Sequence, residues 1–297
     1  MRSLVVALSL VIGAVLNGGA SAQMLALATP AAGESACCHY DLVFQPREGH
    51  ELIVLVTDEK DWTEGKEDPV RYHQRTKAEI AWSFERRDAK SWHARGRLLS
   101  AIRESSRVHG KEKVEELLSW TRADGEAKRQ DGQPAPGWFA DEVEQILTCV
   151  VDRSGVATSQ DADGRLFSRA GLYGSSLLGF GASLSGKSTA PSEKWTKKGD
   201  LLGTDAALTA RYRIEKVASD RREQIAHISG SVVSGWPQTA PGAKAPRTSF
   251  TASFALGTRT PRKSRLSFEH GDVAQVIETS ARWQKVKART QLASLRR

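Results

Sequence analysis

The stretch from Thr76 to Ser100 reads TKAEIAWSFERRDAKSWHARGRLLS, and its pattern decides the fold class. Its first ten residues carry an apolar side chain at every second position, namely Ala78, Ile80, Trp82 and Phe84. Because side chains along a strand point alternately to two faces, this spacing predicts a strand that buries one face. A charged turn around Asp88 follows, and then a second run rich in apolar residues. The stretch therefore predicts an antiparallel hairpin.

A second stretch repeats this order of elements. Residues Ala207–Val217 alternate in the same way, and a charged turn again leads into an apolar run. The segments His93–Ser100 and His227–Ser234 match as H-x-x-G-x-Φ-Φ-S, where Φ is apolar, so Gly96 and Gly230 are equivalent. We predict an internal repeat of two related hairpins, with close packing at each glycine. The histidine that opens each segment is expected to be structural, because catalysis rarely needs two copies.

Other segments predict further strands. The runs His50–Val56 and Ser249–Leu256 are strand-like, and two hairpins are expected with Gly155 and Gly271 in their turns. The predicted fold class is mainly β. Two related antiparallel β halves would form a curved sheet or partial barrel, joined by a short helical connector.

The predicted organisation has four parts. They are a signal peptide (1–22), a first β half (23–160), a Gly- and Ser-rich connector with short helical turns (161–200), and a second β half with a basic C-terminal segment (201–297). One segment, 97–121, fits two structures. The spacing of Val114, Leu117 and Leu118 favours a helix, whereas Leu118 and Trp120 alternate as in a strand. The sequence leaves both open.

The N-terminus has the layout of a secretory signal. Arg2 precedes an apolar run from Leu4 to Leu16, and Ala20-Ser21-Ala22 offers small residues for cleavage before Gln23. The apolar run is too short to cross a bilayer core of ~30 Å as a helix. We expect an exported protein of the periplasm, cell envelope or medium, with no transmembrane span in the mature chain.

The charge excess lies at the C-terminal end. The chain has 43 Lys and Arg against 35 Asp and Glu, and residues 259–297 hold ten basic and three acidic residues. Exposed cations of this kind can meet anionic lipid or acidic glycans, and an exported protein is not expected to meet nucleic acid. The predicted contacts are Arg282, Lys285, Lys287 and Arg289.

The three cysteines are Cys37, Cys38 and Cys149. Either member of the vicinal pair can form a disulfide with Cys149, or the thiols remain free. A zinc site is not predicted, because it needs about four ligands, usually as two spaced pairs.

Two further features bear on ligands. The segment Gly181–Ser188 matches the phosphate-loop pattern G-x-x-x-x-G-K-S, but the polar residues around Pro191 lack the apolar stripe of the helix that must follow. No cofactor and no catalytic or metal residue is therefore predicted. Three tryptophans near Gly or Pro are the candidate ligand-contacting aromatics, namely Trp138, Trp195 and Trp236.

Three segments together resemble a family of exported bacterial proteins of unknown function. They are Phe44–His50 with a P-x-x-G turn, Cys149–Thr158 with a D-x-x-G hairpin, and Pro191–Asp200 with a K-x-G-D turn. The resemblance covers roughly residues 40–285. It implies long antiparallel strands and no catalytic residues.

These features favour a non-enzymatic binding module for a lipid, a glycan or another envelope protein. A hydrolase acting on envelope material, with catalytic residues dispersed along the chain, is the alternative. A purely structural surface protein is a third hypothesis.

Overall fold

The computed structural model describes residues 38–135, 147–155, 157–159, 184–199, 208–220, 223–235 and 246–286. All the described residues belong to one compact unit. Several predictions fall outside the described residues. They are the signal peptide, residues 161–183 and 200 of the connector, Cys37, Trp138, Trp236, Lys287 and Arg289.

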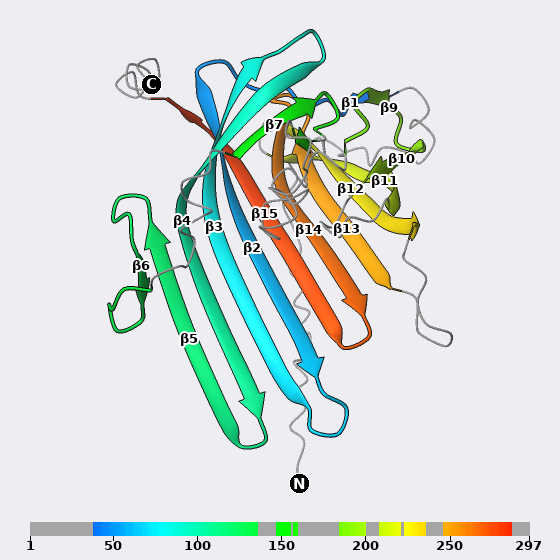
Figure 1. Cartoon of the computed structure of the whole chain (residues 1–297). Coiled ribbons are helices and arrows are strands. Elements are labelled where there is room, and N and C mark those ends of the chain that lie inside the picture. The colour runs from blue at the N-terminus through cyan, green and yellow to red at the C-terminus, as the bar shows by residue number, and fades with distance from the viewer. Residues whose placement is uncertain are drawn as a thin grey trace, which may run out of the picture. The chain divides into compact units, whose positions relative to one another are not determined.

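The described residues form an all-β structure (Figure 1). The strands are β1 (Tyr40–Asp41), β2 (His50–Glu64), β3 (Val70–Arg86), β4 (Ser91–His109), β5 (Glu112–Thr121), β6 (Ala127–Arg129), β7 (Leu147–Asp152), β8 (Ala157–Ser159), β9 (Ser188–Thr189), β10 (Lys194–Gly199), β11 (Leu208–Asp220), β12 (Glu223–Ser234), β13 (Arg247–Ala255), β14 (Thr260–His270) and β15 (Val273–Lys285). The mainly β fold class with long antiparallel strands is thus confirmed.

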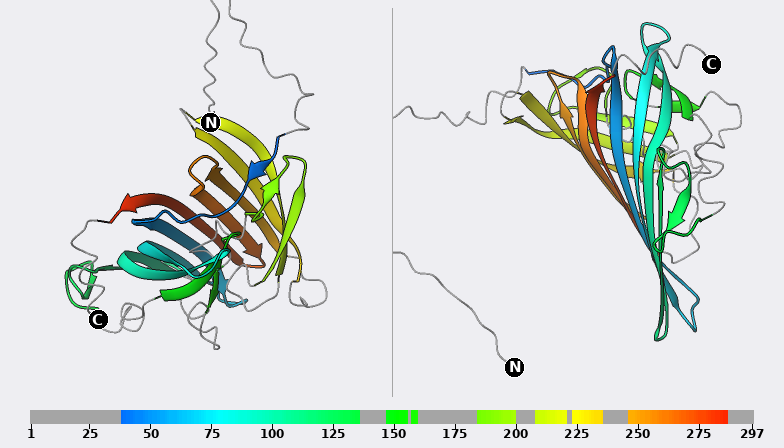
Figure 2. Two further views of the ribbon diagram at one scale, coloured as in Figure 1. Left: turned by 90° about the horizontal axis from the view of Figure 1, so that it is seen from above. Right: turned by 90° about the vertical axis from the view of Figure 1, so that its left-hand side faces the viewer.

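One antiparallel sheet contains thirteen of these strands, in the order β10-β11-β12-β13-β14-β15-β2-β3-β4-β5-β6, with β7 pairing β4 and β8 pairing β7. The two predicted halves meet where β15 pairs with β2 along its full length, from Val273 opposite Trp62 to Lys285 opposite His50. The sheet curves from β11 round to β5 (Figure 2). It is open in the described part of the chain, because β10 and β6 at its ends do not pair with each other.

The helical connector is a correction. Within 161–200 the structure describes residues 184–199, and these form β9 and β10 with turns between them, not helical turns. Strand β9 pairs with β1, and β10 pairs with β11 from Lys194 opposite Arg213 onward. The described part of the connector is therefore strand because it pairs with segments that are distant in sequence. Residues 161–183 of the predicted connector lie outside the described residues.

The segment 97–121 is also strand. Strand β5 pairs with β4 from Ser100 opposite Thr121 to His109 opposite Glu112. Leu118 and Trp120 are buried, at 7% and 3% exposure, while Val114 is 52% exposed. The alternation of Leu118 and Trp120 therefore indicated the right structure, and the helix-like spacing of Val114 did not.

Both predicted hairpins form, and their glycines lie in matching surroundings. Gly96 on β4 lies opposite Trp82 on β3, and Gly230 on β12 lies opposite Tyr212 on β11. In each hairpin the register shifts just beyond, so that Leu99 in the first and Val233 in the second have no opposite residue. The shared sequence pattern thus coincides with shared local geometry, and the internal repeat itself stays a prediction.

The core lies on one side of the sheet, called here the core face. It carries Leu52, Val54, Ile80 and Trp82, each with 0% exposure. On the same face of the second half lie Phe254, Ile228 and Ala226. The opposite side is called the outer face; it presents polar residues with a few exposed apolar ones such as Leu55, at 45% exposure.

A segment before β2, residues 40–48 and called here the strap, joins distant parts of the sheet. Its β1 pairs with β9, and the Phe44 amide donates to the Arg153 carbonyl oxygen at 2.8 Å. The buried Phe44 ring meets Phe84 edge-on, with centroids 5.4 Å apart, and Trp92 with centroids 6.0 Å apart. The strap therefore contacts the hairpin β3–β4 through the Phe44 ring and the end of β7 through the Phe44 amide.

The turn from β13 to β14 also contacts the strap. Arg259 has a φ of +49°, in the left-handed region that non-glycine residues rarely adopt. Its guanidinium donates to the Gln45 side-chain oxygen and to Asp41 Oδ2, the latter at 3.2 Å. These bonds tie the second half of the sheet to the strap, which is a physical reason for the strained backbone to persist.

Candidate functional site

A row of cationic and hydroxyl side chains crosses the outer face of the second half. Strand pairing places Lys216 opposite His227, His227 opposite Ser253, Ser253 opposite Lys263, and Lys263 opposite Ser280. These five residues come from β11, β12, β13, β14 and β15, and we call them the cationic row. Neighbours within such a row have Cβ atoms about 4.5–5.5 Å apart.

A local irregularity sets the composition of the row. The register of β11 against β12 shifts between Ile214 and Lys216, so Lys216 lies opposite His227 and Glu215 has no opposite residue. The Glu215 carboxylate instead accepts hydrogen bonds from Ser229 and from Arg213. The bulge therefore puts an ammonium group, in place of a carboxylate, beside the histidine.

The row lies where two surface grooves meet. A groove of about 1100 Å³ runs along β11–β14, and a second of about 580 Å³ runs along β12–β15 and β2. His227, Ser253 and Lys263 line both. The grooves therefore give a ligand access to the middle of the row from either side.

Most carboxylates around the grooves are already occupied by arginines. Three ion pairs show this, namely Glu223 with Arg262 at 2.5 Å, Glu278 with Arg265 at 2.7 Å, and Glu215 with Arg213 at 2.8 Å. Burial favours a raised pKa for Glu223, but hydrogen bonds from Thr258 and Arg262 outweigh it and lower that pKa. Hydrogen bonds from Ser229 and Arg213 lower the pKa of Glu215.

The two lysines and the histidine of the row have no carboxylate partner in the described part of the chain. Among the described residues, Lys216, His227 and Lys263 make no side-chain hydrogen bond or ion pair. Asp220, at the end of β11, is the one carboxylate lining the larger groove without an arginine partner in the described part of the chain. Two acids and two bases line this groove, so its charge is balanced, and among the described residues Lys263 is its one base without a carboxylate partner.

The pKa of His227 depends on burial and on the charge beside the ring. Its ring is half-buried, and burial first, then the nearby Lys216 ammonium, lower its pKa. Both effects disfavour the imidazolium form. An anion placed between Lys216 and Lys263 would reverse the second effect, because it would stabilise a protonated ring between them.

The predicted anionic-surface contacts are partly described. The Arg282 guanidinium lies on the outer face and pairs with Glu79 Oε1 at 3.2 Å, so part of its charge is already compensated. Lys285 is exposed at the end of β15, opposite His50. The structure does not bring these two residues into the grooves, whose cationic members the sequence analysis did not select.

The candidate aromatics and cysteines are placed as follows. Trp195 is 7% exposed on the core face and stacks on Tyr212, with centroids 6.2 Å apart, so it is a core residue. Cys38 is exposed and Cys149 is buried, and both are free thiols. A disulfide between Cys37 and Cys149 stays a prediction.

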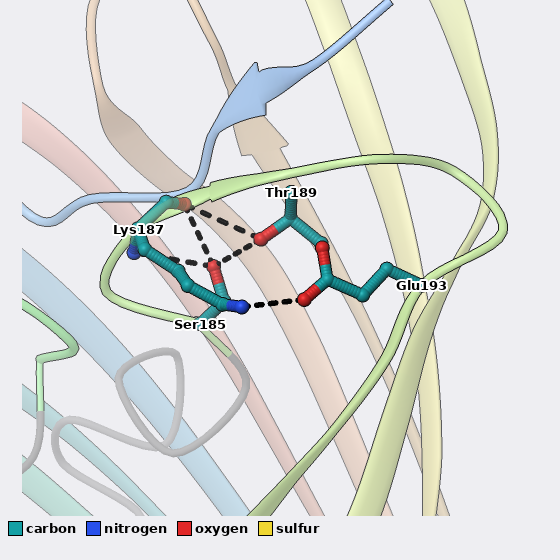
Figure 3. A network of polar contacts seen from close by, with 4 residues as sticks. All are labelled: Ser185, Lys187, Thr189 and Glu193. Atoms are coloured by element: carbon teal, nitrogen blue, oxygen red, sulfur yellow. Dashed lines mark hydrogen bonds and ion pairs between the residues drawn. The ribbon is translucent and has the colours of Figure 1, made fainter. Parts of the chain in front are cut away.

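The segment that matches a phosphate loop has a different structure. Lys187 donates to Glu193 Oε1 at 2.5 Å, and Ser185 donates to the Lys187 carbonyl oxygen at 2.8 Å (Figure 3). Ser188 begins the short strand β9, where a phosphate loop requires a helix. The lysine is therefore held within its own turn by an acidic neighbour.

No helix in the described part of the chain has the length and apolar character that a membrane crossing requires.

No family model matches the sequence. No curated protein matches it either. Three solved structures are similar to parts of the chain. One concerns lipid–protein interactions in lipovitellin, with 10% identity and a TM-score of 0.47 over 82% of this chain; the match spans 26% of the lipovitellin chain. A second is a beta-barrel-like protein of domain of unknown function DUF1849 from Brucella abortus, with 9% identity and a TM-score of 0.24 over 78% of this chain and 98% of that one. A third is a DUF1329 family protein from Desulfovibrio piger, with 8% identity and a TM-score of 0.21 over 81% of this chain and 88% of that one. Similarity at these levels assigns neither a family nor a function to the chain.

Proposed function

We propose that the protein is a non-enzymatic binding module that holds an anionic ligand on the outer face of its sheet. The carrying observation is the cationic row, in which two unpartnered lysines, one unpartnered histidine and two hydroxyl groups lie in register across five strands. Lysine ammonium and hydroxyl groups donate hydrogen bonds to phosphate, sulfate or carboxylate oxygens. In keeping with the predicted signal peptide, we propose that it acts outside the cytoplasm.

The spacing of the row favours a ligand with several negative groups. Adjacent strands lie about 4.8 Å apart, so the backbones at Lys216 and Lys263 are separated by about 14 Å. A single phosphate cannot span this distance, whereas a phosphorylated lipid head group within a membrane surface or an acidic glycan can place charges along it. The ligand chemistry common to both is a multiply charged anion.

A charge reversal tests this proposal. Lys263→Glu should weaken binding to vesicles of phosphatidylglycerol, or to a soluble acidic polysaccharide such as polygalacturonate, by about tenfold or more, because a hydrogen bond to a charged group contributes ~1.5–3 kcal/mol. The matched control is Lys111→Glu, the same change at an exposed turn residue outside the grooves, which should alter affinity less than about twofold.

The two ligands separate the sources of the anion. Binding to vesicles alone identifies a lipid head group, and binding to the polysaccharide alone identifies a glycan. Binding should also fall with salt, because exposed charges are screened beyond ~8 Å at physiological ionic strength. Equal weakening by both variants, or no binding by the unmodified protein, would overturn the assignment of the ligand to the cationic row.

A further inference from the structure

A third groove lies in the first half of the sheet, where β2–β5 extend past the second half (Figure 1). There Trp62 on β2 lies directly opposite Tyr72 on β3. Their rings stack with centroids 4.9 Å apart and planes 8° from parallel. The Lys60 ammonium lies 5.1 Å from the centroid of the Trp62 ring, and the indole N–H donates to Glu64 Oε1 at 3.0 Å. The pair is therefore held in a fixed orientation.

The groove beside this pair has walls from two parts of the chain. Its volume is about 580 Å³, within the range of small-molecule sites. Strands β2–β5 form the floor, where Tyr72 lies opposite Arg107 and Arg107 opposite Val114. The turn after β6 forms the rim with Arg129, Gln130 and Asp131. That turn is tight, since the Gln133 amide donates to Asp131 Oδ1 at 3.0 Å and Gly132 has a φ of +81°.

Aromatic stacking between two strands is by itself a common way to stabilise a hairpin. It does not account for the polar side chains that surround this pair. Among the described residues, Arg107, Glu116 and Gln130 line the groove without a side-chain hydrogen bond or ion pair. Arg107 provides only hydrogen-bond donors, Glu116 provides only acceptors, and Gln130 provides both.

The charge of this groove differs from that of the cationic row. Two bases, Arg107 and Arg129, line it together with two acids, Glu116 and Asp131. The remaining lining acid, Glu115, pairs with Lys113 at 2.6 Å. The near balance of charge disfavours a polyanion. An acyl chain is disfavoured as well, because it would remove these polar groups from water without offering hydrogen bonds in return.

We propose that this groove is a second binding site, for the pyranose rings of a neutral, β-linked glycan. Tyr72 and Lys60 cover the two faces of the Trp62 ring, so a ligand ring would stack on the side of Tyr72 turned away from Trp62. A β-linked pyranose has flat C–H faces that can pack there and a rim of hydroxyl groups that both donate and accept hydrogen bonds. The hydroxyl rim matches Arg107, Glu116 and Gln130. The aromatic face and the partnerless polar rim together carry this assignment, which is independent of the anion-binding proposal.

Calorimetric titration with chitotetraose, a β-linked tetrasaccharide, tests the site directly. Glu116→Gln removes the acceptor charge and should weaken binding about tenfold, as expected for loss of a hydrogen bond to a charged group. The matched control is Glu112→Gln, the same substitution on the same face of β5 but outside the groove, which should leave affinity unchanged. Maltotetraose, which is α-linked, should bind more weakly than chitotetraose.

Two further variants keep the test decisive. Trp62→Ala should abolish binding, and urea unfolding recorded alongside would show whether the fold survives. Lys263→Glu, in the cationic row, should leave chitotetraose affinity unchanged, so the two proposals can fail separately. No binding of either tetrasaccharide at millimolar concentration, or equal loss in Glu116→Gln and Glu112→Gln, would overturn the proposal. Capture of an extended peptide in place of the sugar would do so too.

Discussion

The indole ring of Trp82 lies directly over Gly96 on the neighbouring strand. A Cβ atom at Gly96 would stand 2.9 Å from two atoms of that ring, closer than side chains pack. The same relation recurs in the second half, where a Cβ at Gly230 would stand 2.3 Å from the Tyr212 ring and 2.9 Å from the Arg211 carbonyl oxygen. In both hairpins an aromatic side chain thus occupies the space that a glycine leaves.

Alanine at either glycine should therefore destabilise the protein. Forcing an extra methyl group into a packed core typically costs ~1–3 kcal/mol. Gly230→Ala should cost more than Gly96→Ala, because a backbone oxygen cannot move aside as a side chain can. Urea unfolding measures both. Gly257→Ala serves as the control, since nothing lies within 4 Å of its Cβ position; equal stability of all three variants would contradict the packing described.

Removing the Phe44 ring should detach the strap from the sheet. Phe44 is 2% exposed and meets both Phe84 and Trp92. Large-to-small changes of buried phenylalanine typically cost ~3–5 kcal/mol, so Phe44→Ala should lower the unfolding midpoint strongly. Val114→Ala, at a residue 52% exposed, should change stability by less than about 0.5 kcal/mol. A mild effect of Phe44→Ala would mean that the strap is not part of the core.

The two described thiols should differ in reactivity. Burial raises the pKa of Cys149 to about 12, so almost no thiolate is present at pH 8, whereas Cys38 is exposed. Iodoacetamide at pH 8 should therefore alkylate Cys38 in the folded protein and reach Cys149 only after unfolding. Peptide mass spectrometry reads out each site. Labelling of both at equal rates would contradict the burial of Cys149, and a peptide linked to Cys37 would reveal the predicted disulfide.

The two hairpins can be predicted from sequence because their alternation of apolar residues is local. The alternation through Ile80 and Trp82 and the turn after them lie within one stretch of chain. In the described part of the connector, residues 184–199, helical turns were wrongly expected for the opposite reason, because β9 and β10 exist through pairing with β1 and β11. Local spacing cannot reveal such partners.

The cationic row was out of reach of sequence reasoning. Its members are separated by many residues, and their alignment depends on the pairing of five strands. A bulge beside Lys216 decides whether a lysine or a glutamate faces His227. His227 was noted as a repeat position. Nothing local distinguishes Lys263 from the other basic residues near the C-terminus. The described arginines of that region are paired with acids, which the sequence does not reveal.

The most direct test of the account is a pH titration of the His227 ring by NMR, with and without the anionic ligand. His227→Gln identifies the ring signal among the seven histidines. The charged groups around it are Lys216, Lys263, Arg262, Arg265, Glu223, Glu278 and Asp220, and His227 is the histidine among them. Burial and Lys216 lower its pKa in the free protein, and a bound anion should raise it. By linkage the anion then binds more tightly as the pH falls through the range in which the ring titrates.

A ring pKa that rises on saturation with the ligand is the result predicted here. An unchanged ring pKa with ligand demonstrably bound would contradict binding at the cationic row.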